Sequence, residues 1–138
     1  MATAWSQLGP AIRTRIIAQQ TGSPVPAVYL DYAPLAAPLP YVLIVGVTEE
    51  ELQVFDDDAE TTEIEVDVSI YSDKFNGNTP GATHLSYVNM TKNAIRRWKP
   101  TLANWDVDAL RFDSARNMEP LEDALQTVLS LTAVLERK

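Results

Sequence analysis

The 138-residue chain contains no cysteine and only one histidine, His84. Without cysteine it can form no disulfide bond, no cysteine-based zinc site and no cysteine nucleophile. Its formal net charge of −8 disfavours a protein that works by neutralising phosphates, because such proteins carry a basic surface. No apolar run approaches the roughly 18 residues of a membrane span, and the N-terminus lacks the basic start and apolar stretch of a signal peptide. We therefore expect a soluble, acidic, intracellular protein.

Sequence motifs of known enzyme classes are also missing. The five glycines match neither a P-loop nor a dinucleotide-binding fingerprint, and no Gly-x-Ser-x-Gly nucleophile elbow occurs. His84 has no partner signature for catalysis, so we interpret it as a structural or surface histidine rather than a base or a ligand. The acidic run 56–58, with Glu60, lacks the spacing and the glycine of a calcium loop and is interpreted as a solvated turn. The sequence therefore predicts no catalytic residue, no metal site and no cofactor, and hence no enzyme.

Hydrophobic residues at spacings of three and four predict a helix near the N-terminus. They are Trp5, Leu8, Ile12 and Ile16. Pro10 implies that this helix either starts there or is kinked there, and Thr21 with Gly22 is a plausible stop. Residues 23–40 contain five prolines, which excludes a long helix or a central strand. We interpret this stretch as an extended connection that holds a short strand at 28–30.

Two strands are expected next. Residues 41–47 are continuously apolar and mostly β-branched, which favours a buried strand. The strand is expected to continue over 49–55, with Leu52 and Val54 facing inward. After the turn at 56–58, residues 62–71 alternate strictly between two faces, as in a half-buried antiparallel strand. The inward set is Thr62, Ile64, Val66, Val68 and Ile70, and the outward set is Glu63, Glu65, Asp67, Ser69 and Tyr71.

The C-terminal half adds a helix and two strands. Thr79 followed by Pro80 fits the start of a helix that runs to about Trp98, and residues 107–116 alternate like a strand. Residues 121–135 suit either a helix or a strand, and their β-branched content favours the strand. The length predicts a single domain over residues 1–138. The element order predicts an α+β fold, with two helices packed on one face of a mainly antiparallel sheet.

Charge is segregated along the chain. No Lys or Arg lies between residues 16 and 73, where twelve acids occur, and eleven of those acids lie within 49–73. Residues 74–99 contain five basic residues and no acid. This pattern is compatible with two solvated surfaces of a monomer. That interpretation is favoured for a monomer. The alternative is a head-to-tail assembly, in which the acidic face of one copy meets the basic face of the next and the copies close into a ring or grow into a filament.

Two charged clusters allow more than one interpretation. Glu63, Glu65 and Asp67 form either a solvated outer face, or charge protection of an edge strand, or a surface that repels polyanions. In a ring, that last option would let DNA pass without binding. The basic run 96–99 either contacts a phosphate backbone or forms a cationic last helical turn with Trp98 in the core. The overall acidity favours the second reading of this run.

The order of these segments resembles the tail-terminator, or tail-completion, proteins of long-tailed bacteriophages and prophages. The resemblance covers residues 5–136 and rests mainly on the Leu-Pro-Tyr-Val segment 39–42 and on the strand that ends in Ile70-Tyr71. It implies an α+β subunit, typically of a hexameric ring, that caps the tail tube, halts tube growth and forms the joint to the head-side connector protein. It also implies no enzymatic activity and no cofactor. The Pro-rich 23–40 stretch is longer and more apolar than the family pattern.

The resemblance implies a virion protein of the tail or neck that assembles in the host cytoplasm, with tail-tube and connector proteins as partners and no membrane. Glu63, Glu65 and Asp67 are then predicted to face the ring lumen or solvent. Candidate subunit or partner contacts are Lys74, Phe75, Arg96, Arg97 and Lys99. Two alternatives remain open: a head-completion or neck protein, and a small monomeric binding module with no virion role.

Overall fold

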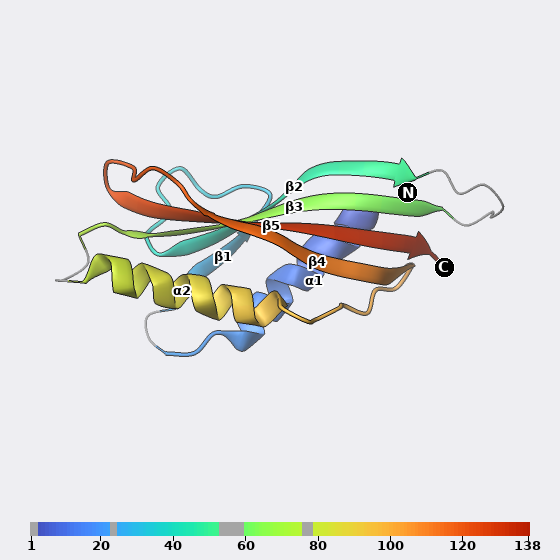
Figure 1. Ribbon diagram of the computed structural model, residues 1–138, viewed down its shortest axis with the longest axis horizontal. Coiled ribbons are helices and arrows are strands. Elements are labelled where there is room, and N and C mark those ends of the chain that lie inside the picture. Colours follow the sequence, from blue (N-terminus) through green and yellow to red (C-terminus); the bar gives the residue numbers. More distant parts are fainter. Residues whose placement is uncertain (1–2, 23–24, 53–59, 76–78) are drawn as a thin grey trace.

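The computed structural model describes residues 3–22, 25–52, 60–75 and 79–138. They form two helices and five strands, which Figure 1 labels. In chain order these are α1 (Ala4–Gln19), β1 (Ala27–Leu30), β2 (Tyr41–Leu52), β3 (Thr61–Asp73), α2 (Pro80–Ile95), β4 (Trp105–Asn117) and β5 (Ala124–Arg137). The turn predicted at 56–58 and the inward position predicted for Val54 lie outside the described residues.

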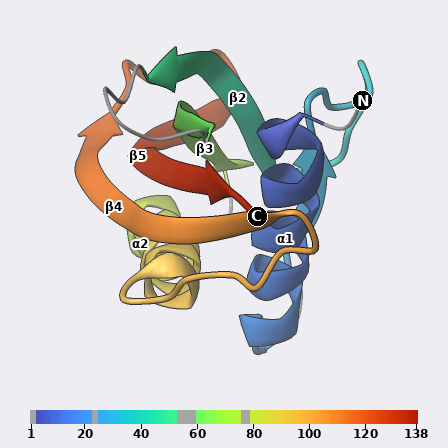
Figure 2. The same ribbon diagram turned by 90° about the vertical axis from the view of Figure 1, so that its right-hand side faces the viewer.

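The strands form one sheet in the order β1-β2-β3-β5-β4. β1 pairs with β2 in parallel, and the other three pairings are antiparallel. Both helices cover the same face of the sheet, and the sheet curls around them (Figures 1 and 2). The predicted α+β class is therefore confirmed. The ambiguous C-terminal segment is the strand β5, which pairs with β3 on one side and β4 on the other, and three of its four β-branched residues are buried.

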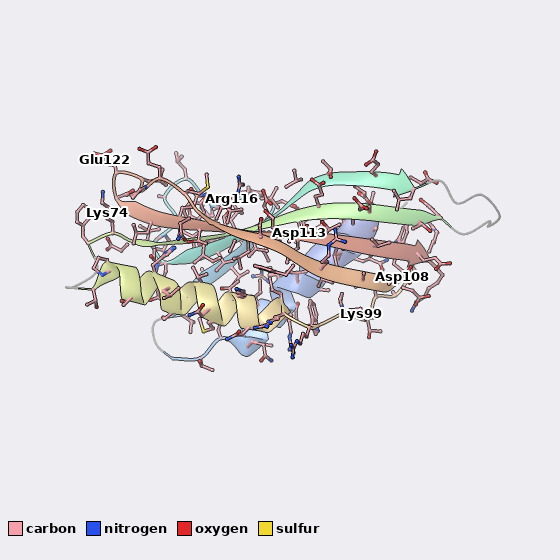
Figure 3. All side chains as sticks on the ribbon, in the orientation of Figure 1. Lys74, Lys99, Asp108, Asp113, Arg116 and Glu122 are labelled. Carbon is pink, nitrogen blue, oxygen red and sulfur yellow. The ribbon has the colours of Figure 1, made fainter. Side chains whose placement is uncertain are left out.

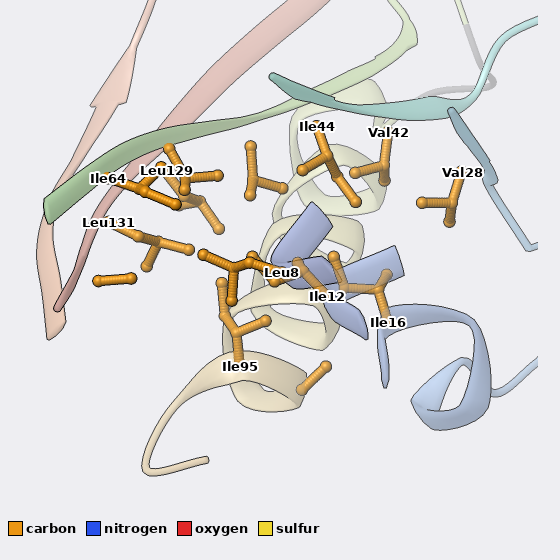
Figure 4. Packing of buried hydrophobic residues seen from close by; sticks show 14 of the residues in the cluster. Leu8, Ile12, Ile16, Val28, Val42, Ile44, Ile64, Ile95, Leu129 and Leu131 are labelled. Atoms are coloured by element: carbon orange, nitrogen blue, oxygen red, sulfur yellow. The ribbon is translucent and has the colours of Figure 1, made fainter. Parts of the chain in front are cut away.

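The core lies between the helix layer and the inner face of the sheet. β3 contributes the alternate residues 64, 66, 68 and 70, which are all completely buried. Leu8, Ile12 and Ile16 of α1 pack against them from the helix layer (Figure 4). Burying a side chain of this size contributes about 1.5–3 kcal/mol. The strict alternation of β3 therefore decides which face of the sheet the helices cover.

A β-bulge makes one inward prediction wrong. The register between β2 and β3 shifts between Gly46 and Thr48, so one residue of β2 has no partner on β3. Past the shift, Leu52 pairs with Thr61 on the outer face, and its side chain is 36% exposed. Because side chains alternate with a period of two, a single extra residue reverses the facing of every later position. The apolar pattern of the sequence does not predict where this extra residue occurs.

The end of α1 at Gln19 agrees with the stop predicted at Thr21 and Gly22, whereas the start of α1 and the end of α2 differ from expectation. α1 begins at Ala4, with Thr3 as N-cap, so Pro10 lies inside the helix rather than at its start. The Glu49 carboxylate accepts a hydrogen bond of 3.1 Å from the Ala4 amide, which satisfies one free donor at this helix end. α2 begins at Pro80 as predicted but ends at Ile95, and Arg97 has a positive φ of 56°. The prediction that this helix runs to about Trp98 is therefore wrong, because the helix already ends at Ile95.

Trp5 joins α1 to the sheet through a hydrogen bond and a close packing contact. Its indole Nε1 donates a hydrogen bond of 2.9 Å to Asp31 Oδ1, just after β1. Its ring lies over Gly46 of β2, where an added Cβ would come within 2.9 Å of ring atoms Cδ2 and Cε2. Glycine at this position lets the helix approach the strand closely.

Replacing Gly46 with alanine is expected to destabilise the protein by about 1–3 kcal/mol, because the Cβ would push the Trp5 ring out of its position. Urea unfolding measures this change. Gly81→Ala is the matched control, because a Cβ at Gly81 would meet nothing within 4 Å in the first turn of α2. We expect the control to change the free energy of unfolding by less than about 1 kcal/mol. Equal effects of the two substitutions would contradict this packing.

Candidate interaction surfaces

The face of the sheet opposite the helices carries an acidic surface. Glu63, Glu65 and Asp67 all point to this outer face, as predicted, and Glu65 is exposed. The β2–β3 register adds Glu50, which lies directly opposite Glu63. We call these four residues the acidic sheet face. β3 has neighbours on both sides, so the alternative that these charges protect an edge strand is wrong.

Polar contacts link the acidic sheet face to β5 and β4. Asp67 accepts a hydrogen bond of 3.1 Å from the hydroxyl of Ser130. Nearby, Asp113 accepts hydrogen bonds from Thr132 and from Arg111 Nε, and the Thr132 bond is the main reason that the pKa of Asp113 is lowered. The pKa of Arg111 is raised mainly by its hydrogen bond to Asp113, and the charge of Glu63 adds a smaller contribution. Its Nε already binds Asp113.

The helix layer has the opposite charge. α1 and α2 contain no Asp or Glu. Six of the eleven basic residues belong to these helices and to the segment that follows α2. We call this set the cationic helix layer: Arg13, Arg15, Lys92, Arg96, Arg97 and Lys99. Within the described part of the chain, the ion pairs involve only Arg111, Arg137 and Lys138, so no member of the layer is neutralised by an acid.

Local contacts hold the cationic helix layer in place. Arg15 Nε donates to the Ala94 carbonyl at 2.8 Å, and its guanidinium lies 5.6 Å from the centre of the Trp98 ring. The half-buried Trp98 thus joins α1 to the end of α2. Arg96 and Arg97 follow directly and are both exposed. Lys99, which Figure 3 labels, follows two residues later and is exposed as well.

The structure divides the predicted contact residues between two separate surfaces. Arg96, Arg97 and Lys99 lie past the C-terminal end of α2, whereas Lys74 and Phe75 lie before its N-terminal end. A helix of 16 residues separates the groups by roughly 24 Å. Lys74 is placed by its amide, which donates to the Asp123 carbonyl at 3.2 Å, and Phe75 is 72% exposed. Sequence reasoning also missed Arg13 and Arg15, although the absence of acids from both helices pointed to them.

His84 belongs to a buried hydrogen-bond network. Its Nδ1 lies 2.6 Å from Ser72 Oγ and its Nε2 lies 2.8 Å from Thr127 Oγ1. Thr127 donates its own proton to Asn117 Oδ1, so its oxygen accepts from His84 Nε2–H, and Ser72 donates to Nδ1. Neutral His84 is therefore fully satisfied. Burial lowers its pKa, because a charged imidazole is disfavoured away from water. The prediction of a structural histidine agrees with this arrangement.

A cavity of about 510 Å³ opens beside this network, between α2 and the β4–β5 connection. Its apolar lining includes Leu85, Val88 and Met118. The polar side chains His84 and Thr127 at its wall already bond to one another. The cavity therefore offers mainly apolar contacts. No catalytic role was predicted for this region, and the wall presents no acid partner for the histidine among the described residues.

A tyrosine ladder crosses the outer face at the other end of the sheet. Tyr41 stacks on Tyr71 with ring centres 4.7 Å apart, and Tyr29 meets Tyr41 edge to face at 5.7 Å. Gln126 donates to the Tyr71 hydroxyl at 2.9 Å. Burial, followed by the neighbouring Tyr71, raises the pKa of Tyr41. Along β2 and β3, the outer face is thus aromatic where Tyr41 pairs with Tyr71 and acidic where Glu50 pairs with Glu63.

Other classes of site find no support in the described residues. Residues 3–22, 25–52, 60–75 and 79–138 contain no group of three or more His, Asp or Glu placed to hold a metal ion. In the same residues, neither helix has the length and apolar character needed to cross a membrane.

Comparison with known proteins finds a structural likeness over the full length of the chain. No family model and no curated protein matches the chain. A chain in the solved virion of a native gene transfer agent (GTA) particle superposes with a TM-score of 0.73 at 19% sequence identity, and the match covers 99% of each chain. At this identity the likeness establishes the fold. Because it spans both chains almost completely, the whole architecture is shared rather than one motif.

His84→Phe is expected to lower the free energy of unfolding by about 1–3 kcal/mol at pH 7.5, because Ser72 and Thr127 lose a buried partner. The folded-state pKa of His84 lies below the unfolded value of 6.5. As the pH falls, the unfolded chain therefore takes up a proton that the folded chain lacks, and the wild type loses stability. Urea unfolding at pH 7.5 and 5.5 should show the gap between wild type and variant shrinking at pH 5.5. A gap that is constant or grows would contradict the neutral network.

Proposed function

We propose that this protein is a structural subunit of a bacteriophage-like virion. The observation that carries the proposal is the fold shared over 99% of both chains with a component of the GTA virion. The protein is proposed to be non-enzymatic, as the resemblance to tail-terminator proteins implies; its one histidine is engaged in structural hydrogen bonds.

Within the virion, the proposed role is that of a tail terminator. Copies form a ring, proposed to be hexameric, that caps the tail tube, ends its growth and joins the tail to the head-side connector. Two features support this role: the order of the Leu-Pro-Tyr-Val segment and the acidic strand, and the two oppositely charged surfaces of one chain. Acids of this strand pair that a neighbouring copy leaves uncovered would face the lumen or solvent and would repel the phosphates of passing DNA.

A gene deletion in cells that produce the particle tests this role. Without the cap, tube growth has no stop, so we expect tails of uneven length that are not attached to heads. Electron microscopy measures both properties, and expression of the chain from a plasmid should restore them. Tails of uniform length that lack heads would instead indicate the alternative role, a head-completion or neck protein. Intact particles of normal length would contradict both roles and favour a small binding module.

A further inference from the structure

The two charged surfaces lie on opposite sides of one molecule. The acidic sheet face lies on the side of the sheet that the helices leave open (Figure 1). The cationic helix layer belongs to the two helices on the other side and to the segment after α2. Neither surface can reach the other within one chain, because the core lies between them. Any contact between them must therefore join two molecules.

Each surface also retains charge that the chain does not neutralise. Glu50 and Glu63 lie directly opposite each other on β2 and β3, and like charges in such a cross-strand pair repel. Arg111 lies near Glu63, but its Nε is bonded to Asp113. On the other side, Arg96 and Arg97 have no acidic partner among the described residues. Both surfaces would therefore gain from a partner of opposite charge.

We propose that the acidic sheet face of one copy binds the cationic helix layer of the next copy. The inference rests on the proposed ring and names the surfaces that build it. The contact is heterologous, because each copy contributes a different surface to each of its two neighbours, and such contacts close into rings when the rotation allows. Four acids meet six cations. The complementary charges also orient the copies as they approach.

A second copy fits the cationic helix layer better than a nucleic acid does. The net charge of −8 opposes the long-range approach of a polyanion and of a second copy alike, so the preference rests on how the charges are arranged. A second copy brings its acids on a preformed strand pair, and its own cationic side remains available for the following copy. Nucleic-acid binding by the same layer is therefore an alternative outcome of the test below.

Charge reversal on each surface separately, and then in combination, tests this contact. The first variant carries Glu50→Lys and Glu63→Lys. The second carries Arg96→Glu and Arg97→Asp, since aspartate tolerates the positive φ at position 97 better than most residues do. Light scattering across protein concentrations at low and high salt measures self-association. The wild type should associate at low salt and weaken as salt screens the charges.

Each variant alone should associate at least roughly tenfold more weakly than the wild type, because attraction becomes repulsion at every contact. An equimolar mixture of the two variants should recover association, since each reversed surface then meets its complement on the other variant. A single chain with all four substitutions should recover it as well. Glu119→Lys with Glu122→Lys is the matched control: it makes the same charge change as the first variant at exposed residues between β4 and β5 (Figure 3), and it should associate like the wild type.

Several results would overturn the proposal. They are a wild type that stays monomeric at low salt, variants that associate as well as the wild type, and a mixture that does not recover. Binding of the wild type to duplex DNA at physiological salt, lost in the Arg96/Arg97 variant without any change in association, would assign the helix layer to nucleic acid. Variants that associate normally while the gene deletion still gives uneven tails would reject this contact and leave the tail role standing.

Discussion

The central position of β3 is the constraint on which the rest of the structure depends. Strands on both sides satisfy its backbone, so its side chains have only the two faces of the sheet to occupy. The β-branched residues from Ile64 to Ile70 occupy one face, and the helices must cover it. The acids of the same strand are thereby forced onto the other face, which neither helix covers. One alternating strand thus determines the core and the acidic sheet face together.

The helix layer completes this division of charge. The two helices that pack on one face of the sheet carry cations and no acids. Arg15 shows how packing and charge are combined: its Nε bonds to the backbone of α2 and its guanidinium lies against Trp98, yet no acid neutralises it. The molecule is therefore polarised across its thickness, and the fold itself sets the separation of its two charged surfaces.

Alternation and composition predicted most of the fold. The inward set of β3, the strand character of residues 124–137 and the start of α2 at Pro80 all follow from local patterns. The errors arise where a tertiary feature leaves no local signal. Leu52 faces outward because of a bulge six residues earlier, and α2 ends at Ile95 because Arg97 adopts a left-handed conformation that favours glycine in other proteins. The hydrogen-bond network of His84 joins residues 12 and 43 positions apart, which no spacing rule connects.

The candidate surfaces were predicted less completely than the fold, because a surface is a property of neighbouring elements. The acids of β3 were found from one strand, but Glu50 joins them only through the β2–β3 register.

The most direct test of the virion role is to locate the chain in purified particles with a gold-labelled antibody. The account predicts label at one position in each particle, where the tail meets the head. Particles without label, or with label along the whole tail, would contradict it.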